Sequence, residues 1–309
     1  MSVQTSGGQR ETLFAPGHRA CPGCGVALAV RHILEATGKN VIVVTPTGCL
    51  ETFGSPYGYS PWRVPWIHHL FENGPSIASG VAAALRVQKR DHIRVIVIAG
   101  DGATFDIGFG ALSGMLERGD DVLYICVDNG AYMNTGGQRS GATPLYASTT
   151  THPSGRVSMG KTERKKDLPS IVAAHGIPYV ATASVAYLKD LQRKVQKAME
   201  YRGARYIQID TPCPSVWGFS SELTMEVGRL GVACGLVPLY EIVEGKVTGV
   251  RKIGRKVPVV DYLRTQGRFK HLFRGDDAQG ELADIQTLAD RNIEAHRLVG
   301  SPLTTSKRD

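Results

Sequence analysis

The sequence predicts an α/β fold: a doubly wound, mostly parallel sheet with helices on both faces, followed by a C-terminal extension. Apolar segments of strand length alternate with segments of helical spacing between residues 26 and 235, and such alternation is typical of parallel sheets. The strand segments are apolar almost throughout, as expected where helices cover both faces of a sheet. Two of them end in short polar groups, Gly100-Asp101-Gly102 and Asp128-Asn129.

The first half of the chain supplies three strands and three helices, after an irregular arm at residues 1–20. The strands are β-branched runs such as Val95-Ile96-Val97-Ile98, which favour extended backbone. Residues 45–73 are rich in glycine, proline and aromatic residues and are predicted to form one long loop, a kind of segment that is often functional. The expected elements are a helix at 26–37, a strand at 41–44, a helix at 75–88, a strand at 93–99, a helix at 107–118 and a strand at 122–127.

Periodicity is lost over residues 128–167, where glycine, serine, threonine and proline dominate, and we expect a second long functional loop. The alternation then resumes with a helix at 168–175, a strand at 179–182, a helix at 185–201, a strand at 205–210 and a helix at 221–235. The rest of the chain differs and contains a hairpin-like stretch at 240–253, a basic linker and a final helix at 281–298. We therefore divide the chain into a ligand-binding domain at 1–236 and an extension at 237–309 that contacts neighbouring subunits.

Composition and charge exclude several classes of protein. With 42% hydrophobic and 21% charged residues the chain is typical of globular proteins, and no apolar run approaches the roughly 20 residues of a membrane helix. Residues 1–10 lack the apolar core of a secretion signal, so we expect a cytoplasmic protein. The net charge of +8 is spread along the chain without an aromatic-and-basic motif. This argues against nucleic-acid binding and favours docking of an acidic partner, such as a small electron carrier. The basic run at 161–166 is predicted to be a solvated loop.

The polar groups at the two strand ends form a candidate site for a diphosphate and a magnesium ion. Gly100 and Gly102 would let the backbone approach a phosphate, and Asp101 faces the crevice where parallel α/β folds bind ligands. Mg²⁺ prefers oxygen ligands in octahedral array. The protein would contribute three of these ligands: Asp101, the Asn129 amide oxygen and the carbonyl near Ala131. Gly-Asp-Gly alone is also a common tight turn, but its pairing with Asp-Asn at the next strand favours the functional interpretation.

Four of the six cysteines border loops and are candidate metal ligands. They are Cys21 and Cys24 in a Cys-x-x-Cys turn, Cys49 after the first strand, and Cys213 after the strand at 205–210. Four thiolates can bind zinc or a [4Fe–4S] cluster, although zinc ribbons usually pair two Cys-x-x-Cys turns. A thioredoxin-like redox pair would need a strand before Cys21, and none is predicted. Cys126 and Cys234 lie in apolar segments and are predicted to be core residues.

With both candidate sites in view, the chain resembles the β subunits of 2-oxoacid:ferredoxin oxidoreductases, and the pyruvate-specific members of that family in particular. The resemblance rests on the stretches HRACPGCG, TGCLETF, PWIHHLFENGPSIASG, GDGATFDIG, GALSGMLERGDDVLYICVDN, AYMNTGGQRSGATP, KKDLPSIVAAHGIPYVATAS, TPCPS and QGRFKHL. They span residues 18–272, so the extension follows the family too. The resemblance implies the pyrophosphate-type thiamine-diphosphate-binding fold for the sheet.

The resemblance also implies three cofactors and assigns residues to them. A [4Fe–4S] cluster is expected on Cys21, Cys24, Cys49 and Cys213, and Mg²⁺ on Asp101, Asn129 and the Ala131 carbonyl. Thiamine diphosphate is expected to contact Gly48, Cys49, Gly100, Asp101, Gly102, Ala103, Asn129, Ala131, Tyr132, Met133 and Asn134, with Cys49 and Asn134 nearest the reaction. Arg139 and Ser140 follow this loop and are candidates to line the site. His68, His69 and His152 are predicted to be satisfied or solvated loop histidines rather than catalytic bases.

The reaction that the resemblance implies is oxidative decarboxylation of a 2-oxoacid with coenzyme A, giving acyl-CoA, CO₂ and two reduced ferredoxins. Thiamine enzymes need a glutamate at the pyrimidine ring, on a second domain of similar size, and the residues after 237 are too few to form one. The Cys-x-x-Cys-x-x-Cys-x-x-x-Cys run of a ferredoxin-type relay is also missing from the sequence. We therefore expect a hetero-oligomer with α, γ and ferredoxin-like δ subunits.

Two departures from the family pattern bear on the substrate. Gly130 stands where the family commonly has an acidic residue, and Ser215-Val216 stand where it commonly has Thr-Gly. Pyruvate is the favoured substrate, and branched-chain, aryl and oxalate-like 2-oxoacids are the alternatives. Two rival interpretations also stay open. A non-redox thiamine decarboxylase or transketolase subunit would have no reason to keep four cluster-competent cysteines, and a zinc-stabilised structural protein would leave Gly-Asp-Gly and Asp-Asn without a role.

Overall fold

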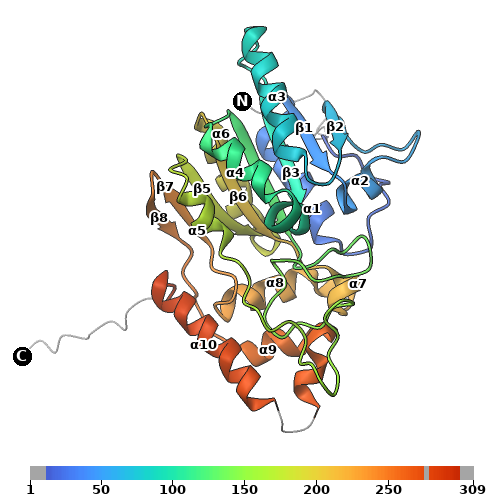
Figure 1. Ribbon diagram of the computed structural model, residues 1–309, viewed down its shortest axis with the longest axis vertical. Helices are drawn as coiled ribbons and strands as arrows, with labels where there is room; N and C mark the ends of the chain where they lie inside the picture. Colours follow the sequence, from blue (N-terminus) through green and yellow to red (C-terminus); the bar gives the residue numbers. More distant parts are fainter. Residues whose placement is uncertain (1–11, 275–277, 300–309) are drawn as a thin grey trace, which may run out of the picture.

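The computed structural model describes residues 12–274 and 278–299, and its centre is one eight-stranded sheet (Figure 1). The strand order is β2-β1-β3-β4-β6-β5-β7-β8. The first six strands pair in parallel, and the last two are antiparallel. The strands are β1 (Val41–Pro46), β2 (Trp66–His69), β3 (Arg94–Gly100), β4 (Val122–Asp128), β5 (Tyr179–Ser184), β6 (Arg205–Asp210), β7 (Tyr240–Val243) and β8 (Lys246–Val250). The predicted mostly parallel α/β sheet is confirmed.

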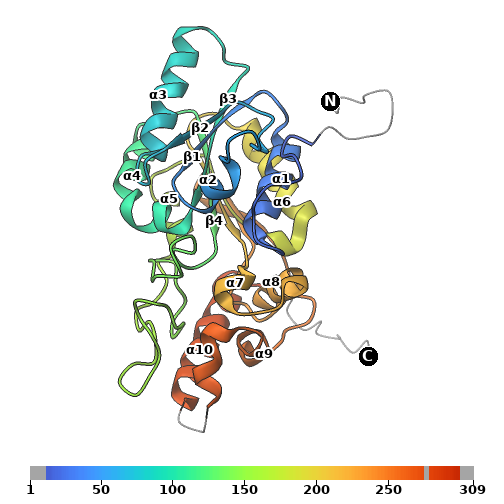
Figure 2. The same cartoon turned by 90° about the vertical axis from the view of Figure 1, so that its right-hand side faces the viewer.

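Helices cover both faces of this sheet (Figure 2). On one face α1 (Gly25–Thr37) packs along α6 (Leu188–Glu200), and both bury apolar side chains, such as Ile33 and Val195, against the strands. On the other face lie α3 (Gly74–Val87), α4 (Phe109–Glu117) and α5 (Leu168–Ala173), with their own apolar cluster. Because both faces are covered, the central strands are buried along almost their whole length, and this explains their unbroken apolar sequences.

The prediction of a single loop over residues 45–73 is wrong in two places. A short helix, α2 (Cys49–Gly54), follows β1, and β2 pairs in parallel with β1 at the edge of the sheet. Most side chains of β2 are only partly buried, and Trp66 stacks on Trp62 with ring centroids 5.6 Å apart. An edge strand of this kind carries no apolar run, so periodicity could not detect it. The described part of the N-terminal arm, from residue 12 to residue 20, contains only one isolated bridge, between Phe14 and Trp62.

Residues after 237 contribute both to the sheet and to a separate layer. The predicted hairpin is present as β7 and β8, and β7 pairs with β5 at the sheet edge. Below the sheet lie α8 (Thr224–Ala233), α9 (Val259–Arg264), η4 (Gly267–Phe273) and α10 (Gln279–Ala295) (Figure 1). They enclose a third apolar cluster around Trp217 and Phe269, and α10 confirms the predicted final helix. The domain boundary near residue 236 and the contact of the extension with neighbouring subunits stay predictions.

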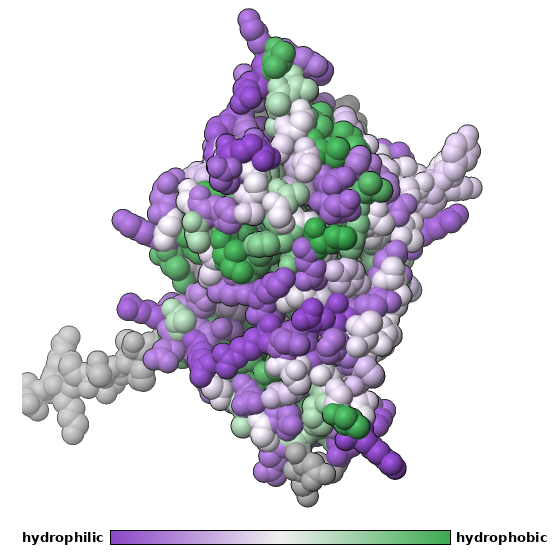
Figure 3. Space-filling view, in the orientation of Figure 1, coloured by the Kyte–Doolittle hydropathy of each residue, from purple (hydrophilic) through white to green (hydrophobic). Residues whose placement is uncertain are grey.

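The surface is mixed in character. Hydrophilic side chains cover much of the face seen in Figure 3, and apolar ones gather in separate patches, mainly over the half that holds the sheet. Val87 and Ile107 are examples of exposed apolar side chains. Within the described ranges, no helix is long and apolar enough to cross a membrane.

A buried carboxylate on β7 forms ion pairs with two side chains of α6. Glu241 is 3% exposed and accepts hydrogen bonds from Lys197 Nζ at 2.7 Å and from the Tyr179 hydroxyl at 3.0 Å. It also pairs with Arg193 at 2.7 Å. Burial alone would raise the pKa of Glu241, but these three donors lower that pKa to about 2. The ionised carboxylate is therefore the form that stabilises the fold.

We expect the Glu241→Gln variant to unfold more easily, by about 2 kcal/mol near neutral pH. The folded pKa lies below the unfolded value of about 4.3, so the stabilisation is present above about pH 4.3 and is lost as the pH falls toward 2. Urea denaturation of both proteins at a series of pH values measures the difference. Glu200→Gln, at the exposed end of α6, serves as the control. An effect of Glu241→Gln that does not shrink in acid would contradict this account.

Candidate active site

The carboxyl ends of β1, β3 and β4 open onto a cavity of about 290 Å³. The parallel pairing aligns Gly100 with Val127, and so brings Asp101 next to Asn129 across the two strand ends. The residues that line this cavity include all eleven that were predicted to contact the thiamine cofactor: Gly48, Cys49, Gly100, Asp101, Gly102, Ala103, Asn129, Ala131, Tyr132, Met133 and Asn134. Residues from three separate parts of the sequence therefore meet at one place, where parallel α/β sheets bind their ligands.

The segment after β3 is a π-helical turn, η1 (Gly102–Ile107), a feature that is frequent at functional sites. The ring of Tyr132 lies against this turn, so that a Cβ atom on Gly102 would lie 2.6 Å from it. A Cβ atom on Gly100, in contrast, would meet nothing within 4 Å. Gly102 is thus required by packing, whereas Gly100 leaves open space beside the backbone.

Asp106 holds the loop that follows β4 against this turn. One of its oxygens accepts hydrogen bonds from the Tyr132 hydroxyl at 3.1 Å and from the Gly141 backbone N–H at 2.9 Å. Lys166 lies 3.2 Å from the other oxygen. These contacts fix the position of the loop that carries Tyr132, Met133 and Asn134.

Three oxygen atoms converge at the floor of the cavity without a hydrogen between them. The side-chain oxygen of Asn129 lies 2.8 Å from Asp101 Oδ1 and 3.0 Å from the backbone oxygen of Ala131. Oxygen acceptors this close repel one another. Turning the Asn129 amide over would replace the repulsion by two hydrogen bonds, and a cation between the three oxygens would remove it with the amide as it stands. This group of atoms could therefore hold a metal ion.

The charge of Asp101 is poorly compensated within the described chain. The residue is 1% exposed and accepts hydrogen bonds from Ser140 Oγ at 2.5 Å and from the Asn129 N–H at 3.3 Å. Burial, together with the negative charge of Asp128, raises the pKa of Asp101 to about 7. A bound cation would stabilise its ionised form. Ser140 acts through Asp101 rather than lining the cavity.

Sequence reasoning missed the groups that support Asp128. This carboxylate is 4% exposed, pairs with Lys165, and accepts hydrogen bonds from Gln208 Nε2 at 2.8 Å and from the Gly130 N–H at 3.1 Å. The prediction of a solvated loop at 161–166 is wrong for Lys161, which is fully buried. Residues 162–166 are exposed as predicted, but Lys165 and Lys166 also pair with acidic side chains. The available clue was that an aspartate at a buried strand end needs a cationic or hydrogen-bonding partner.

The remaining polar candidates lie away from the cavity wall. Arg139 faces Glu163 at 3.8 Å. His68 Nε2 lies 3.1 Å from the Thr47 hydroxyl. The prediction of satisfied or solvated loop histidines is wrong in part, because His68 and His69 belong to strand β2 and the Nδ1 atoms of His69 and His152 are buried without a partner among the described residues. None of the three is among the described residues that line the cavity.

The four loop cysteines come from three segments that pack together. In the Cys21–Cys24 turn, the N–H of Cys24 donates to the Cys21 carbonyl at 3.1 Å. The next residue, Gly25, donates to the Pro212 carbonyl at 3.3 Å, just before Cys213. Cys49 begins α2 and lines the cavity. The predicted core cysteines, Cys126 and Cys234, are both fully buried.

The four thiols lie close enough together for their charges to interact. Burial, with smaller contributions from the other three thiols and Asp101, raises the pKa of Cys49 to about 12. Burial likewise raises the pKa of Cys24 to about 11, and Cys213 and Cys21 add to the effect. However, no three His, Cys, Asp or Glu side chains in the described ranges are placed so that they could hold a single metal ion. The thiols are thus gathered in one region without converging on one point.

Comparisons with known proteins agree with this geometry. A family model described as "Thiamine pyrophosphate enzyme, C-terminal TPP binding domain" matches residues 46–209. Pyruvate synthase subunit PorB of Methanosarcina barkeri is 51% identical over 289 residues, which cover 93% of this chain and 98% of that protein. The chain belongs to the family of 2-oxoacid:ferredoxin oxidoreductase β subunits. It is accordingly a subunit of a thiamine-diphosphate-dependent enzyme.

Other members of this family carry different names. Ketoisovalerate oxidoreductase subunit VorB of Pyrococcus abyssi is 43% identical over 273 residues, which cover 86% of this chain and 88% of that protein. A solved structure of 2-oxoglutarate:ferredoxin oxidoreductase from Magnetococcus marinus aligns with a TM-score of 0.55 at 26% identity, over 64% of this chain and 65% of that chain. The thiamine-diphosphate-binding fold expected from the sequence is confirmed.

Proposed function

We propose that this chain is the catalytic β subunit that holds thiamine diphosphate, Mg²⁺ and a [4Fe–4S] cluster for the oxidative decarboxylation of a 2-oxoacid with coenzyme A. Acyl-CoA and CO₂ would be the products, and ferredoxin would accept the electrons. Pyruvate is the favoured substrate. The observation that carries the proposal is the assembly of all eleven expected cofactor contacts around one cavity, which Cys49 shares with the cysteine group.

The spacing of the three floor oxygens supports magnesium. Mg²⁺ binds oxygen at about 2.0–2.1 Å in octahedral geometry, so neighbouring ligands lie about 2.9 Å apart. The distances from the Asn129 oxygen to those of Asp101 and Ala131 are 2.8 and 3.0 Å. Asp101 would supply the negative charge, and Ser140, which donates to its second oxygen, would fix its orientation.

Within the described ranges the thiols are not placed around a single ion, as a bound zinc would require. A zinc ion at about 2.3 Å from each sulfur would draw four thiols to within about 3.8 Å of one another, whereas the four irons of a [4Fe–4S] cluster each take one thiolate and need a wider set. The four thiols lie close enough to influence one another, yet no three are placed for a single ion among the described residues.

The chain's own part in catalysis is to bind and orient. The thiamine cofactor supplies the electron sink for decarboxylation. Gly100 leaves room for a phosphate beside the backbone, and Trp217 Nε1 donates to the Asn129 carbonyl at 2.7 Å, which steadies the residue beside the metal position. Asn134 is exposed at the rim of the cavity, where it would meet the substrate.

Other subunits are proposed to complete the site. The family model that matches is one thiamine-binding domain, and the pyrimidine-side glutamate would come from an α subunit, with γ and ferredoxin-like δ subunits in the same cytoplasmic complex. Large exposed side chains in the segment between α2 and α3 support such contacts, because aromatic residues are enriched at interfaces. Tyr57 and Tyr59 are fully or largely exposed, and so is Leu70, next to the cavity residue Phe71. Full activity of the isolated chain would contradict this proposal.

A branched-chain 2-oxoacid is the second candidate substrate. It is favoured by one observation, the 43% identity with a subunit named for ketoisovalerate. The 51% identity with PorB keeps pyruvate first.

Purification of the complex without oxygen tests the proposed function. We expect a brown protein with broad visible absorbance that is bleached by a 2-oxoacid together with coenzyme A, and by neither alone. A panel of pyruvate, 2-oxoisovalerate, phenylglyoxylate and other 2-oxoacids would rank the substrates. A colourless protein with stoichiometric zinc would refute the proposal.

A further inference from the structure

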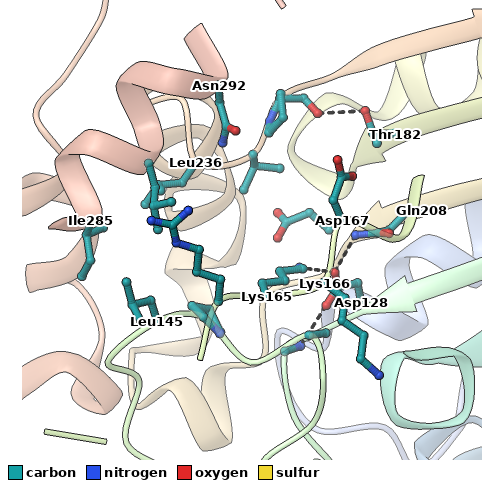
Figure 4. Close-up of a pocket in the computed structure, with 18 of the residues that line it drawn as sticks. Asp128, Leu145, Lys165, Lys166, Asp167, Thr182, Gln208, Leu236, Ile285 and Asn292 are labelled. Atoms are coloured by element: carbon teal, nitrogen blue, oxygen red, sulfur yellow. Dashed lines mark hydrogen bonds and ion pairs between the residues drawn. The ribbon is translucent and has the colours of Figure 1, made fainter. Parts of the chain in front are cut away.

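A second cavity, of about 280 Å³, lies between the sheet and the C-terminal helices. Figure 4 shows Asp128, Gln208 and Thr182 on its sheet side, and Ile285 and Asn292 on its helical side. Most of its remaining wall is apolar, with contributions from Leu145, Leu236, Val237, Leu263, Phe269 and Leu288. The cavity thus has a largely apolar wall with charged residues on its sheet side, a combination that is usual in small-molecule sites.

One buried cation in this cavity has no ionic partner. Arg268 is 6% exposed, and its guanidinium carbon lies 3.7 Å from the centroid of the Trp217 ring. Its Nε donates to Gln266 Oε1 at 2.9 Å. Its Nη2 is buried without a hydrogen-bond partner among the described residues, and Asp210 and Asp128 act on the guanidinium through charge alone, without a hydrogen bond. A buried guanidinium is strongly unfavourable unless an anion compensates it.

The two carboxylates nearest to Arg268 are already engaged. Asp128 pairs with Lys165 and accepts from Gln208. Asp210 accepts a hydrogen bond from Ser184 Oγ at 3.1 Å, and burial followed by the negative charge of Asp128 raises the pKa of Asp210 to about 7. Burial lowers the pKa of Arg268, and both carboxylates oppose this through their charge without contacting it, so its Nη2 remains without a hydrogen-bonding anion among the described residues.

The chain carries no side chain at a position next to the guanidinium. Gly130 lines the same cavity and has a φ of 77°. A Cβ atom on Gly130 would lie 3.1 Å from Arg268 Nη1 and 3.4 Å from Pro144 Cδ. A Cβ atom at this position would crowd Nη1, and a longer side chain would compete with any ligand of Arg268.

We propose that this second cavity binds a small organic carboxylate, with its carboxylate on Arg268 and its apolar body against the helices. A planar carboxylate matches the two-pronged guanidinium. A phosphate dianion fits less well, because Asp128 and Asp210 are close by. Lys165 and Lys166 also line the cavity but already pair with Asp128 and Asp106, and Arg164 is exposed to solvent. The site is separate from the cofactor cavity but shares a wall with it, since Trp217 contacts Arg268 and donates to Asn129.

Calorimetric titration of the full chain with sodium butyrate tests this site, with butyramide and inorganic phosphate as parallel probes. We expect saturable butyrate binding, with butyramide and phosphate weaker by about 10-fold or more. Tryptophan fluorescence should change with the same saturation curve, and Trp217→Phe should remove that change. Absence of saturable butyrate binding, or equal binding of the neutral amide, would overturn the proposal. Tighter binding of phosphate would overturn the carboxylate assignment.

Two matched variants at Gly130 distinguish a specific loss of butyrate binding from a general loss of folding. Asp and Asn both tolerate left-handed backbone. Gly130→Asp would place an internal carboxylate beside Arg268 and is expected to weaken butyrate binding by about 10-fold or more, whereas Gly130→Asn should weaken it much less. Ile285→Phe, which fills the cavity from the helical side, should also prevent binding while leaving Arg268 in place. Equal effects of Gly130→Asp and Gly130→Asn, or unchanged binding in Ile285→Phe, would refute the site.

Discussion

The Asp101→Asn variant is expected to lose magnesium-dependent binding of thiamine diphosphate, and with it activity, while its apo form becomes more stable. Asp101 supplies the only carboxylate among the three oxygens at the floor of the cavity. An amide in its place removes the negative charge that a divalent cation requires, so we expect cofactor affinity to fall by at least about 100-fold. Isothermal titration of the apo complex with thiamine diphosphate and Mg²⁺ measures this loss.

The gain in stability has a separate cause. Burial and the charge of Asp128 raise the pKa of Asp101 to about 7 in the folded chain, above the value of about 3.9 for an unfolded aspartate. The apo protein therefore loses stability as the pH rises from about 4 to about 7, and an asparagine escapes this loss. We expect Asp101→Asn to unfold with a free energy higher by a few kcal/mol at about pH 8, and with almost no difference near pH 4.

Asp284→Asn is a suitable control for both measurements. Its carboxylate, on α10, accepts a hydrogen bond from the Tyr146 hydroxyl at 2.8 Å and does not line the cofactor cavity, so Asp284→Asn should change neither cofactor affinity nor the shape of the pH profile. Wild-type cofactor affinity in Asp101→Asn would eliminate Asp101 as a magnesium ligand. An apo variant less stable than the wild type at high pH would show that Asp101 is compensated in some other way.

The parts of the molecule that could be predicted from the sequence are those determined by local pattern. Strands such as β3 and β4 lie at the centre of the sheet, are buried on both faces, and so read as unbroken apolar runs. The polar groups at their ends stood out against those runs, and strand pairing brings them together. The helices that cover the sheet were likewise visible in their 3.6-residue spacing. β2 escaped prediction because an edge strand with partly buried side chains leaves no such pattern.

The parts that could not be predicted depend on contacts between distant segments. Lys165 lies in a run that reads as solvated, and only the fold brings its ammonium to Asp128, 37 residues away. Arg268 sits in the extension, and nothing in the local sequence shows that it stacks on Trp217. In both cases a charged side chain contacts a residue that is distant in the sequence, and composition and periodicity carry no information about such contacts. Ser140 was recognised as a candidate for the site, but its bond to Asp101 follows from the path of a loop with no periodicity.

The second large effect is expected from Cys213→Ser. This thiol lies at the start of α7 (Pro214–Trp217), packed against the Cys21–Cys24 turn through the Gly25–Pro212 hydrogen bond. If it holds one iron of a [4Fe–4S] cluster, the variant complex should lose its broad visible absorbance and reduce ferredoxin more than about 100-fold more slowly. Cys213 does not line the cofactor cavity in the described structure, so binding of thiamine diphosphate should be retained.

Comparison with two other cysteines makes this test specific. Cys234→Ala removes a fully buried thiol in the C-terminal layer and should lower the free energy of unfolding by about 1 kcal/mol without loss of colour. Cys49→Ser should lose colour as Cys213→Ser does and should also weaken thiamine diphosphate binding, because Cys49 lines the cavity as well as belonging to the thiol group. Retention of the full absorbance in Cys213→Ser would exclude it as a ligand. A matching loss of cofactor binding in Cys213→Ser and Cys49→Ser would show instead that the thiol group supports the cavity wall as a whole. The difference between these two variants thus measures whether Cys49 alone connects the proposed cluster to the cofactor cavity.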